Sequence, residues 1–485
     1  MTLLDATTWT GKVYVDGWQP GGGGDLTVVE PATGNELGRL GRASTEDVAR
    51  AAARAAEAQR PWASAIYQER AAVMRRAGAL FEEHADEIQG WIVRETGAIP
   101  PKAQLEDWFA ATSCYEAAGL VSHPYGELLR TRDPVLSMSR RLPLGVVGVI
   151  SPFNFPLILS IRAVAPALAL GNAVLLKPDP RTSIAGGVVL ARIFEEAGLP
   201  AGLFALLPGA SDVGEALIAD PNTQMVSFTG STRAGRAVGA LAGQHLKKVH
   251  LELGGNSALI VLDDVDVEKA VSVGAFGSFM HQGQICMTTG RHLVQRSIAD
   301  EYTTILAAHA DHTPVGDPAT EQVALGPVID EHQRDNIHRV VTESVGAGAR
   351  LAAGGTYEGL FYRPTVLGDT PTDSAAFREE IFGPVAPVVP FDSIDEAVKL
   401  ASDSEHGLSL GILTHDVMKG MEIAERIPSG VVHINDQTVG DEVVNPFGGV
   451  RGTGSSWLGG PEANINAFTQ VQWVTMRGDL PEYPF

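Results

Sequence analysis

The sequence predicts an α/β protein that is built on parallel β-sheet and divided into more than one domain, and two observations lead to that prediction. From residue 146 onward, short runs of Val, Ile and Leu recur between helical stretches, and strands that are buried on both faces of a parallel sheet have this composition. The chain has 485 residues, of which 44% are hydrophobic. Because a single core stops growing at about 250–300 residues, we expect two or three domains.

The N-terminal part is expected to begin with strands and to continue with helices. Residues 12–18, KVYVDGW, alternate apolar and polar side chains around an Asp-Gly pair, which is typical of a β-hairpin. The sequence STED at 44–47 is a helix-capping pattern before an alanine-rich stretch. Helical sequence resumes after Pro61 and runs to about Leu120.

Apolar runs of strand length then follow one another. We assign to a first parallel sheet the runs GVVGVI, AVLLKP, FALLPG, MVSFTG, VHLELGG and ALIVLDD. After about Asp264 the alternation restarts, with a helix over 265–281, a strand over 292–295 and later strands in APVVPF and GILTH. The sequence therefore predicts a second α/β domain.

Two segments with strand-like sequences, 127–144 and 468–476, belong to neither of these domains. A strand near a terminus leaves an edge with unpaired backbone groups, and pairing across a subunit interface would cover that edge. We therefore expect a homo-oligomer, either a dimer or a tetramer.

Charge and cysteine content exclude several classes of protein. The formal net charge is −22, from 36 Lys and Arg against 58 Asp and Glu, which repels nucleic acid and anionic membranes. The two cysteines, Cys114 and Cys286, are too few for a disulfide framework. The N-terminal MTLLDATTWTGK lacks the basic and apolar regions of a signal peptide, so the expected compartment is the cytoplasm.

Residues 142–161 carry no charge and match the ~20 residues of a membrane-spanning helix. Pro143, Pro152 and Pro156 remove backbone donors, however, and a helix exposed to lipid would be left with unsatisfied carbonyl groups. We predict instead a buried strand, GVVGVI, that leads into a loop shaped by proline.

Three residues are candidates for chemistry. Cys286 lies among Gly, Gln and Thr, which suit a loop better than a packed core, whereas Cys114 lies in a helical stretch and fits a buried structural role. Glu252 follows a buried strand, where a carboxylate would have a raised pKa that suits a general base, although a surface Glu at a strand end fits the same pattern. Asn154, in SPFNFP, could donate to an oxyanion or cap a turn.

Cofactor motifs are incomplete. FTGSTRAG places Gly230 and Gly235 between a strand and a helix, where backbone amides can meet a pyrophosphate, and Lys177 at a strand end could bind a ribose or remain solvated. No G-x-G-x-x-G and no Walker A sequence occurs. Absence of C-x-x-C and H-E-x-x-H gives no support for a metal site, and absence of G-x-S-x-G disfavours a serine hydrolase.

Seven motifs together resemble the NAD(P)-dependent aldehyde dehydrogenase superfamily, in its order and approximate spacing. They are SPFNFP, LLKP, FTGSTRAG, LELGGNS, GQIC, EEIFGPV and NPFGG, and they span almost the whole chain. The resemblance implies two parallel-sheet α/β domains and a small β oligomerisation element. It places the cofactor-binding domain at 1–123 and 145–252, the catalytic domain at 253–444, and the oligomerisation element with the C-terminal segment at 124–144 and 445–485.

The resemblance also implies the roles of individual residues. Cys286 is the expected nucleophile, Glu252 the general base, and Asn154 the side-chain half of an oxyanion hole whose other half is the Cys286 amide. The residues expected to bind NAD or NADP are Lys177, Gly230, Ser231, Gly235, Glu380, Phe382, Ser151 and Phe153. An aldehyde would become a thiohemiacetal and then a thioester, and water activated by Glu252 would release the acid.

This chain departs from the family pattern at three positions. Relatives selective for NAD often carry Glu three residues after the lysine, where this chain has Pro180 between Asp179 and Arg181, so NAD and NADP both remain open. Phe153 stands where many relatives have Trp, and Thr288 stands where a smaller residue is usual. Neither of these two changes touches the chemistry.

Longer stretches resemble one branch of the superfamily, the benzaldehyde, salicylaldehyde and vanillin dehydrogenases. They are HQGQICMTTGR, SMSRRLPLGVVGVISPFNFPL, KPDPRT and DQTVGDEVVNPFGG. An aromatic aldehyde is therefore the expected substrate, with the ring substituents and the pathway left open. The alternatives are an aliphatic aldehyde or a semialdehyde, a cysteine-dependent hydrolase without a nicotinamide cofactor, and a non-catalytic binding protein on the same fold.

Overall fold

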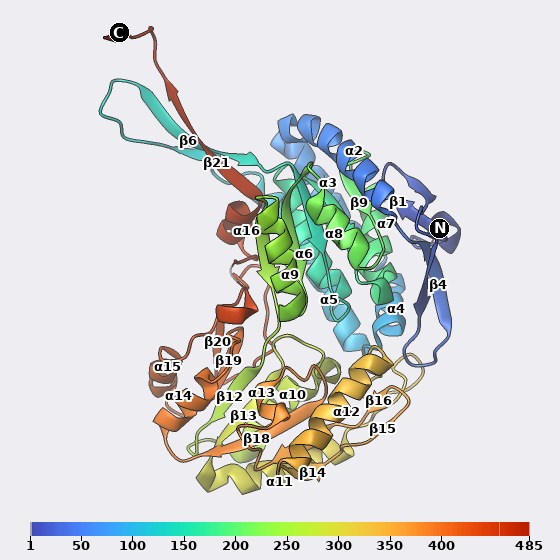
Figure 1. The fold of residues 1–485 in the computed structure, drawn as a ribbon, viewed down its shortest axis with the longest axis vertical. Coiled ribbons are helices and arrows are strands. Elements are labelled where there is room, and N and C mark those ends of the chain that lie inside the picture. The colour runs from blue at the N-terminus through green and yellow to red at the C-terminus, as the bar shows by residue number, and fades with distance from the viewer. Residues whose placement is uncertain (1, 455, 485) are drawn as a thin grey trace.

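The computed structural model describes residues 2–454 and 456–484. Two seven-stranded sheets, each covered by helices, form an upper and a lower lobe in Figure 1, and a narrow arm that carries the C-terminus projects from the upper lobe. Helices alternate with mostly parallel strands in both lobes, so the predicted α/β class is confirmed.

The first sheet has the order β11-β10-β7-β8-β9-β1-β2. Strands β7 to β11 run parallel, and the predicted hairpin of β1 and β2 is confirmed as an antiparallel pair at one edge. The strands are β1 (Lys12–Tyr14), β2 (Trp18–Pro20), β7 (Val146–Ile150), β8 (Ala173–Lys177), β9 (Phe204–Leu206), β10 (Thr223–Thr229) and β11 (Lys248–Glu252).

Among the described residues up to 252, nine α-helices lie in the lobe of the first sheet, and α16 (Pro461–Phe468) packs against α6 there. The predicted cap is confirmed, because the side chains of Ser44 and Asp47 each accept a hydrogen bond from the other residue's backbone amide at the start of α2. The helices are α1 (Ala6–Trp9), α2 (Thr45–Ser64), α3 (Tyr67–Glu83), α4 (Ala85–Thr96), α5 (Pro100–Leu120), α6 (Pro156–Ala169), α7 (Val189–Glu196), α8 (Ser211–Ala219) and α9 (Thr232–Gln244). A separate ribbon consists of β3 (Asp25–Val29) and β4 (Glu36–Gly41).

The second sheet has the order β14-β17-β18-β13-β12-β19-β20, and β14 alone of its described strands runs antiparallel to its neighbour. Its strands are β12 (Ser257–Val261), β13 (Thr289–Gln295), β14 (Arg350–Ala353), β17 (Thr365–Gly368), β18 (Val385–Phe391), β19 (Ser409–Leu413) and β20 (Val431–Ile434). Around it lie α10 (Val267–Phe279), α11 (Arg296–His312), α12 (Glu331–Gly346), α13 (Ala375–Arg378), α14 (Ile394–Ser402), α15 (Val417–Ala424) and the small hairpin β15 (Tyr357–Glu358) and β16 (Phe361–Tyr362).

The run ALIVLDD forms β12 and belongs to the second sheet, so its assignment to the first sheet was wrong. Only residues 253–256 separate β11 from β12. Two parallel strands of one sheet need a crossover of a dozen or more residues, which this connection is too short to provide. The chain must therefore pass from one sheet to the other immediately after Glu252.

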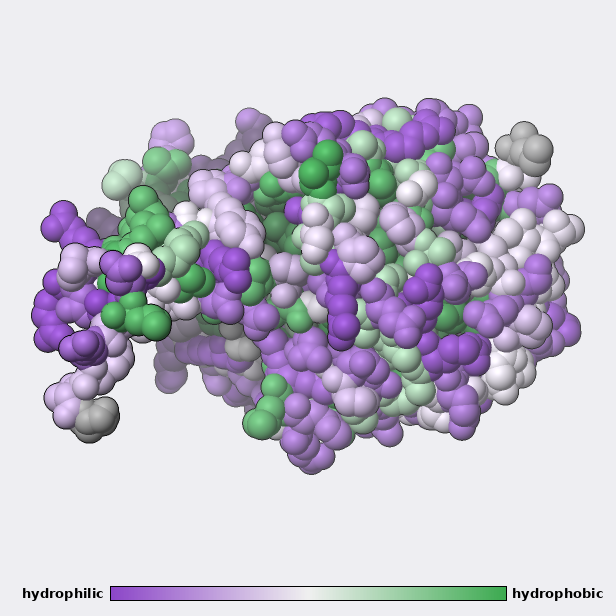
Figure 2. Space-filling model, turned by 90° about the horizontal axis from the view of Figure 1, so that it is seen from above, coloured by the Kyte–Doolittle hydropathy of each residue, from purple (hydrophilic) through white to green (hydrophobic). Residues whose placement is uncertain are grey.

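The arm is a three-stranded antiparallel ribbon of β5 (Gly126–Leu128), β6 (Leu136–Pro143) and β21 (Thr469–Met476). The two segments predicted as strands outside the domains pair with each other here, from Thr469 opposite Pro143 to Met476 opposite Leu136. Figure 2 shows hydrophobic side chains gathered on this arm, at the left of the view. Among the described strands, β21 pairs only with β6, so the ribbon ends in an open edge.

Within the described residues, no helix combines the length and the apolar character that crossing a membrane requires. The uncharged segment 142–161 divides into the end of β6, the buried strand β7, a loop and the start of α6. The prediction of a buried strand followed by a proline-rich loop is therefore confirmed.

Candidate active site

The candidate residues gather where strands of the first sheet end and the chain crosses to the second sheet. The Gly230 amide, after β10, donates to the Glu252 carbonyl at 3.0 Å, and the Ser151 amide, after β7, donates to the Lys177 carbonyl at 3.2 Å. Carboxyl ends of parallel strands share one edge of a sheet, which is where α/β proteins bind ligands.

Cys286 lies in a turn just before β13, as its polar neighbours predicted. The backbone leading to it is unusual, because His281, Gln282 and Gly283 have consecutive positive φ angles of 48°, 55° and 66°. A Cβ on Gly283 would lie 2.1 Å from the Gly383 carbonyl oxygen, so only glycine fits there. For His281 and Gln282 this conformation costs on the order of 1–3 kcal/mol each, and such strain concentrates at functional sites.

The surroundings of the Cys286 thiol are apolar and negatively charged. It borders a buried cluster that includes Phe109, Phe155 and Phe447. Burial raises the pKa of the thiol, and the nearby carboxylates of Glu380 and Glu252 raise it further. A reactive thiolate here needs either a base to accept its proton or a positive charge beside it.

Glycines allow the Cys286 turn to approach the loop after β11. A Cβ on Gly255 would lie 2.0 Å from the Cys286 carbonyl oxygen, and one on Gly254 would lie 2.3 Å from the Glu380 carboxylate. The Gly255 amide donates to Glu380 Oε1 at 2.9 Å. A larger residue at 255 would force the Cys286 turn away from the loop after β11, and one at 254 would displace the Glu380 carboxylate.

Asn154 is buried in the loop between β7 and α6. Its Nδ2 donates to the carbonyl of Gln284, two residues before the cysteine, at 2.8 Å. An amide nitrogen carries two hydrogens, so one remains for a ligand at the thiol. This geometry suits a donor to a developing oxyanion.

Glu252 is 5% exposed, and neither of its carboxylate oxygens has a hydrogen-bond partner among the described residues. Burial raises its pKa well above the ordinary range, the Arg162 cation lowers it, and the Asp441 anion raises it. His250 Nε2 lies 3.8 Å from Glu252 Oε1, but burial lowers the pKa of this histidine to about 3, so it is neutral. An unpartnered buried carboxyl with a raised pKa has the properties of a general base.

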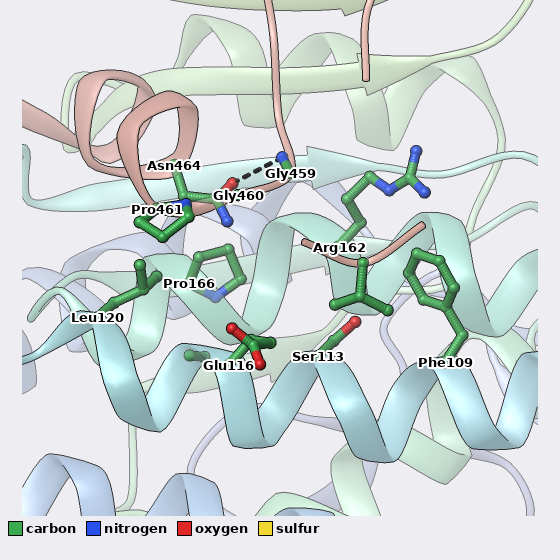
Figure 3. A pocket seen from close by; sticks show the side chains of 12 residues that line it. Phe109, Ser113, Glu116, Leu120, Arg162, Pro166, Gly459, Gly460, Pro461 and Asn464 are labelled. Carbon is green, nitrogen blue, oxygen red and sulfur yellow. Dashed lines mark hydrogen bonds between the residues drawn. The ribbon is translucent and has the colours of Figure 1, made fainter. Parts of the chain in front are cut away.

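A cavity adjoins the apolar cluster around the thiol and is shown in Figure 3. Phe109 of α5 and Arg162 of α6 lie side by side at one end, and the Gly459 amide donates to Asn464 Oδ1 near the other. The Arg162 guanidinium forms an ion pair with Asp441 and lies 5.1 Å from the Phe109 ring and 4.5 Å from the Phe447 ring. Aromatic faces and a paired cation thus lie between this cavity and the apolar cluster that Cys286 borders.

A second group of residues lies on the cofactor side. Lys177 ends β8 with its side chain buried, and within the described chain its ammonium makes no hydrogen bond to protein. Ser231 caps α9, its hydroxyl accepting from the Ala234 amide at 3.3 Å. A buried cation without a partner and the first amides of a 13-residue helix suit the hydroxyl and pyrophosphate groups of a dinucleotide.

Gly230 and Gly235 differ from the sequence-based expectation. The Gly230 amide donates to the Glu252 carbonyl, and the Gly235 amide donates to the Ser231 carbonyl at 2.9 Å, so neither is free for a phosphate. Gly235 lies inside α9 and permits close packing, because a Cβ there would lie 2.1 Å from Leu253. The free amides are expected from Ser231 onward.

Phe153 and Phe382 meet edge to face, with ring centroids 5.8 Å apart, and Phe382 has a positive φ of 54°. The Arg181 guanidinium lies 4.3 Å from the Phe153 ring. Arg181 also donates to both oxygens of Asp179 at 2.9 Å, so this carboxylate is already paired. Asp179 therefore does not substitute for a glutamate at position 180, where this chain has proline. Ser151 is buried, and its hydroxyl accepts from Ser160 at 2.7 Å.

Sequence patterns missed four charged residues near the site. Lys102 and Glu106 look like an ordinary surface pair on a helix, but both are buried against the Asn154 loop. Arg162 did carry a signal, since it is the only charged residue of α6, PLILSIRAVAPALA. Asp441, which pairs with Arg162, follows it by 279 positions in the sequence and lies in an irregular loop. No local pattern connects the two residues.

A partly buried thiol in a strained turn, a buried carboxyl with a raised pKa and a buried lysine at the strand ends beside a helix N-terminus are the features that a cysteine-dependent dehydrogenase requires. Comparison with known proteins gives the family. The aldehyde dehydrogenase family model matches residues 18–474. The chain belongs to the aldehyde dehydrogenase family and is an NAD(P)-dependent aldehyde dehydrogenase.

Several relatives are similar over their whole length. A vanillin dehydrogenase from an Amycolatopsis species is 64% identical, with 100% of both chains covered. A benzaldehyde dehydrogenase [NAD(+)] from Pseudomonas putida is 48% identical, with 98% of both covered. The crystal structure of a Pseudomonas putida salicylaldehyde dehydrogenase complexed with salicylaldehyde has a TM-score of 0.94 at 32% identity, and the match covers 98% of this chain and 99% of that one.

Proposed function

We propose that this enzyme oxidises an aromatic aldehyde of the benzaldehyde or vanillin type to its carboxylic acid. The observation on which the proposal rests is the apolar cluster of Phe109, Phe155 and Phe447 at the Cys286 thiol, which suits a flat ring. The names of the two relatives described above agree with it.

The first chemical step belongs to Cys286. Its thiolate attacks the aldehyde carbon, a carbon–sulfur bond forms, and the former carbonyl oxygen becomes an oxyanion. The free hydrogen of the Asn154 amide and the Cys286 backbone amide donate to that oxygen. A nicotinamide held beside Phe153 and Phe382 would supply a positive charge that favours the thiolate, and an acceptor for the hydride that leaves the substrate carbon when its carbon–hydrogen bond breaks and the thioester forms.

The second step belongs to Glu252. With no protein partner on its carboxylate, it can take a proton from a water molecule, whose oxygen attacks the thioester carbon. The carbon–sulfur bond breaks, the thiolate returns, and the carboxylic acid leaves. The retained proton passes from Glu252 to solvent before the next cycle.

For the cofactor we propose that Lys177 and Glu380 bind the riboses, that Ser231 and the first amides of α9 receive the pyrophosphate, and that Phe382 with Phe153 borders the nicotinamide. Support comes from the unpartnered ammonium of Lys177 and from the contact between the two rings. NAD and NADP are both accepted in this proposal, because Pro180 places no carboxylate against a 2′-phosphate.

A semialdehyde is the main competing substrate, since its second carboxylate would need a cation in the pocket. Arg162 is a cation at that place, but Asp441 neutralises it and two aromatic rings enclose it. A carboxylate substrate would have to displace Asp441 and leave that carboxylate without its partner. An aromatic ring meets no such penalty.

We further propose that residues 1–123 with 145–252 bind the cofactor, that 253–444 carry the nucleophile, and that 124–144 with 445–485 join subunits in a homodimer or homotetramer. We also propose the cytoplasm as the compartment. A reducing environment keeps Cys286 as a free thiol, which the reaction requires.

The decisive experiment follows absorbance at 340 nm with benzaldehyde or vanillin, separately with NAD and with NADP. Reduced cofactor should form with the parent enzyme and not with Cys286→Ala, while Cys114→Ala, at the buried second cysteine, should stay active. No signal with any aromatic aldehyde, beside turnover of an aliphatic aldehyde or a semialdehyde, would refute the aromatic assignment. No signal with any aldehyde would favour a protein without redox catalysis.

A further inference from the structure

The buried pair Lys102 and Glu106 on α5 lies directly behind Asn154. The two side chains are 1% and 0% exposed and form a salt bridge one helical turn apart. Removing two charges from water costs several kcal/mol each, and the attraction between the two repays that cost only in part. A buried pair of this kind therefore contributes little net stability and calls for another explanation.

The contacts of the pair converge on one short segment, 154–158. Lys102 Nζ donates to the Asn154 carbonyl at 2.7 Å and lies 4.4 Å from the Phe155 ring. Glu106 Oε2 accepts from the amides of Leu157 at 3.0 Å and Ile158 at 3.2 Å. The start of α6 has no side-chain cap of its own, so Glu106 supplies that cap from the neighbouring helix.

α5 thus holds the segment at two places: Lys102 binds the Asn154 carbonyl, before Phe155, and Glu106 binds two backbone amides after Phe155. The segment meets the nucleophile loop at two points: the Asn154 side chain donates to the Gln284 carbonyl, and the Phe155 ring lies 5.3 Å from the His281 ring. Misplacing a catalytic group by 1 Å can cost about 100-fold in rate. The direction of the second Asn154 hydrogen therefore depends on how firmly α5 holds this backbone.

We infer that Lys102 and Glu106 are positioning residues that fix the Asn154 amide of the oxyanion hole. This inference rests on the proposed role of Asn154. Neither residue touches substrate or cofactor in this proposal, and both act through the backbone of the 154–158 segment that carries Asn154.

The test is a double-mutant cycle with Lys102→Met/Glu106→Gln, which removes both charges and nearly keeps the volume. We expect kcat to fall about 10- to 100-fold with KM little changed. In an Asn154→Ala background the same pair should cost almost nothing further, because the donor that the pair positions is gone. Alkylation of Cys286 by iodoacetamide, which forms no oxyanion, should keep its rate.

Asp107→Asn is the matched control, since Asp107 is a buried carboxylate on the same helix that accepts from Gln89 and not from the 154–158 segment. If the paired variant unfolds, Glu106→Asp keeps the charge and shortens its reach to α6, and a loss of kcat that vanishes in the Asn154→Ala background is again expected. An equal loss in both backgrounds, slower alkylation or an unchanged kcat would overturn the inference. Full activity of Asn154→Ala alone would instead refute the oxyanion role itself.

Discussion

At the scale of single residues, Glu252 allows the two chemical steps to be measured separately, because in the proposed mechanism it acts only in hydrolysis of the thioester. Glu252→Gln removes the base for hydrolysis and leaves the thiol and the Asn154 donor in place. We expect a burst of about one reduced cofactor per active site, followed by steady turnover slower by about 10²- to 10⁴-fold. Stopped-flow absorbance at 340 nm measures both phases. A variant that turns over at the parent rate would show that another group activates the water.

The pH dependence of hydrolysis is set by the charges around Glu252. Because burial raises its pKa, the carboxyl is protonated at low pH, and kcat under hydrolysis-limited conditions should rise as pH increases through that pKa. Arg162→Leu removes a cation that lowers this pKa, so the rising limb should move to higher pH. Asp441→Asn removes an anion that raises it, so the limb should move to lower pH. Opposite shifts in kcat–pH profiles at saturating aldehyde are the required result, and shifts in one direction would contradict it.

Sequence alone predicted the local backbone structure at two of the candidate residues. The turn at Cys286 and the strand end at Glu252 were both visible in the chain because small and polar residues interrupt apolar runs there. Lys102 and Glu106 were not, because opposite charges four positions apart on a helix usually mark a solvated face. Their burial results from the packing of α6 against α5, which is a non-local event.

At the scale of elements, α5 carries more buried charge than its sequence indicated. Burial raises the pKa of Asp107 to about 6, above its ordinary value of 3.8. The folded protein therefore holds this proton more tightly than the unfolded chain, and the free energy of unfolding decreases as pH rises from about 4 to about 6. Above about pH 6, Asp107 is ionised in the folded and the unfolded state, and the free energy of unfolding stays lower by the full cost of burying its charge.

Asp107→Asn should remove this penalty. We expect its melting temperature to exceed that of the parent by more at pH 8 than at pH 5, as measured by differential scanning calorimetry in buffers of equal ionic strength. Comparing the two pH values cancels any change in the hydrogen bond from Gln89 that the amide brings. A gain that is equal at both pH values would place the effect in packing and not in charge.

The sequence predicted the strands but not the sheet to which each strand belongs. Apolar runs identified the strands of both sheets, because composition reports burial on two faces. Composition does not report which sheet a strand joins, and ALIVLDD was misplaced for that reason. The length of the link after Glu252 would have identified the correct sheet. Four residues are too few for the crossover that connects two neighbouring parallel strands of one sheet.

At the scale of the whole molecule, the arm is the feature that a single chain does not explain. A ribbon of three strands without a covering layer is marginal in water. Leu128, Val471 and Trp473 on it are 77%, 61% and 70% exposed. Residues 124–144 also contain four arginines against two carboxylates, in a chain whose net charge is −22. In the proposed homo-oligomer, a second copy would offer both an apolar surface for these side chains and an acidic body for the arginines.

Trp473→Asp should therefore break the assembly. A carboxylate in the centre of an apolar contact loses its hydration without gaining a partner, and neither sheet of the subunit depends on this exposed side chain. In size-exclusion chromatography with light scattering, the parent should elute as a dimer or tetramer and the variant at the 51.2 kDa of one chain. Leu351→Asp, on β14 at the far edge of the second sheet, is the matched control and should keep the parent mass. A parent that elutes as a monomer, or a Trp473→Asp variant that keeps the parent mass, would show that the arm does not hold subunits together.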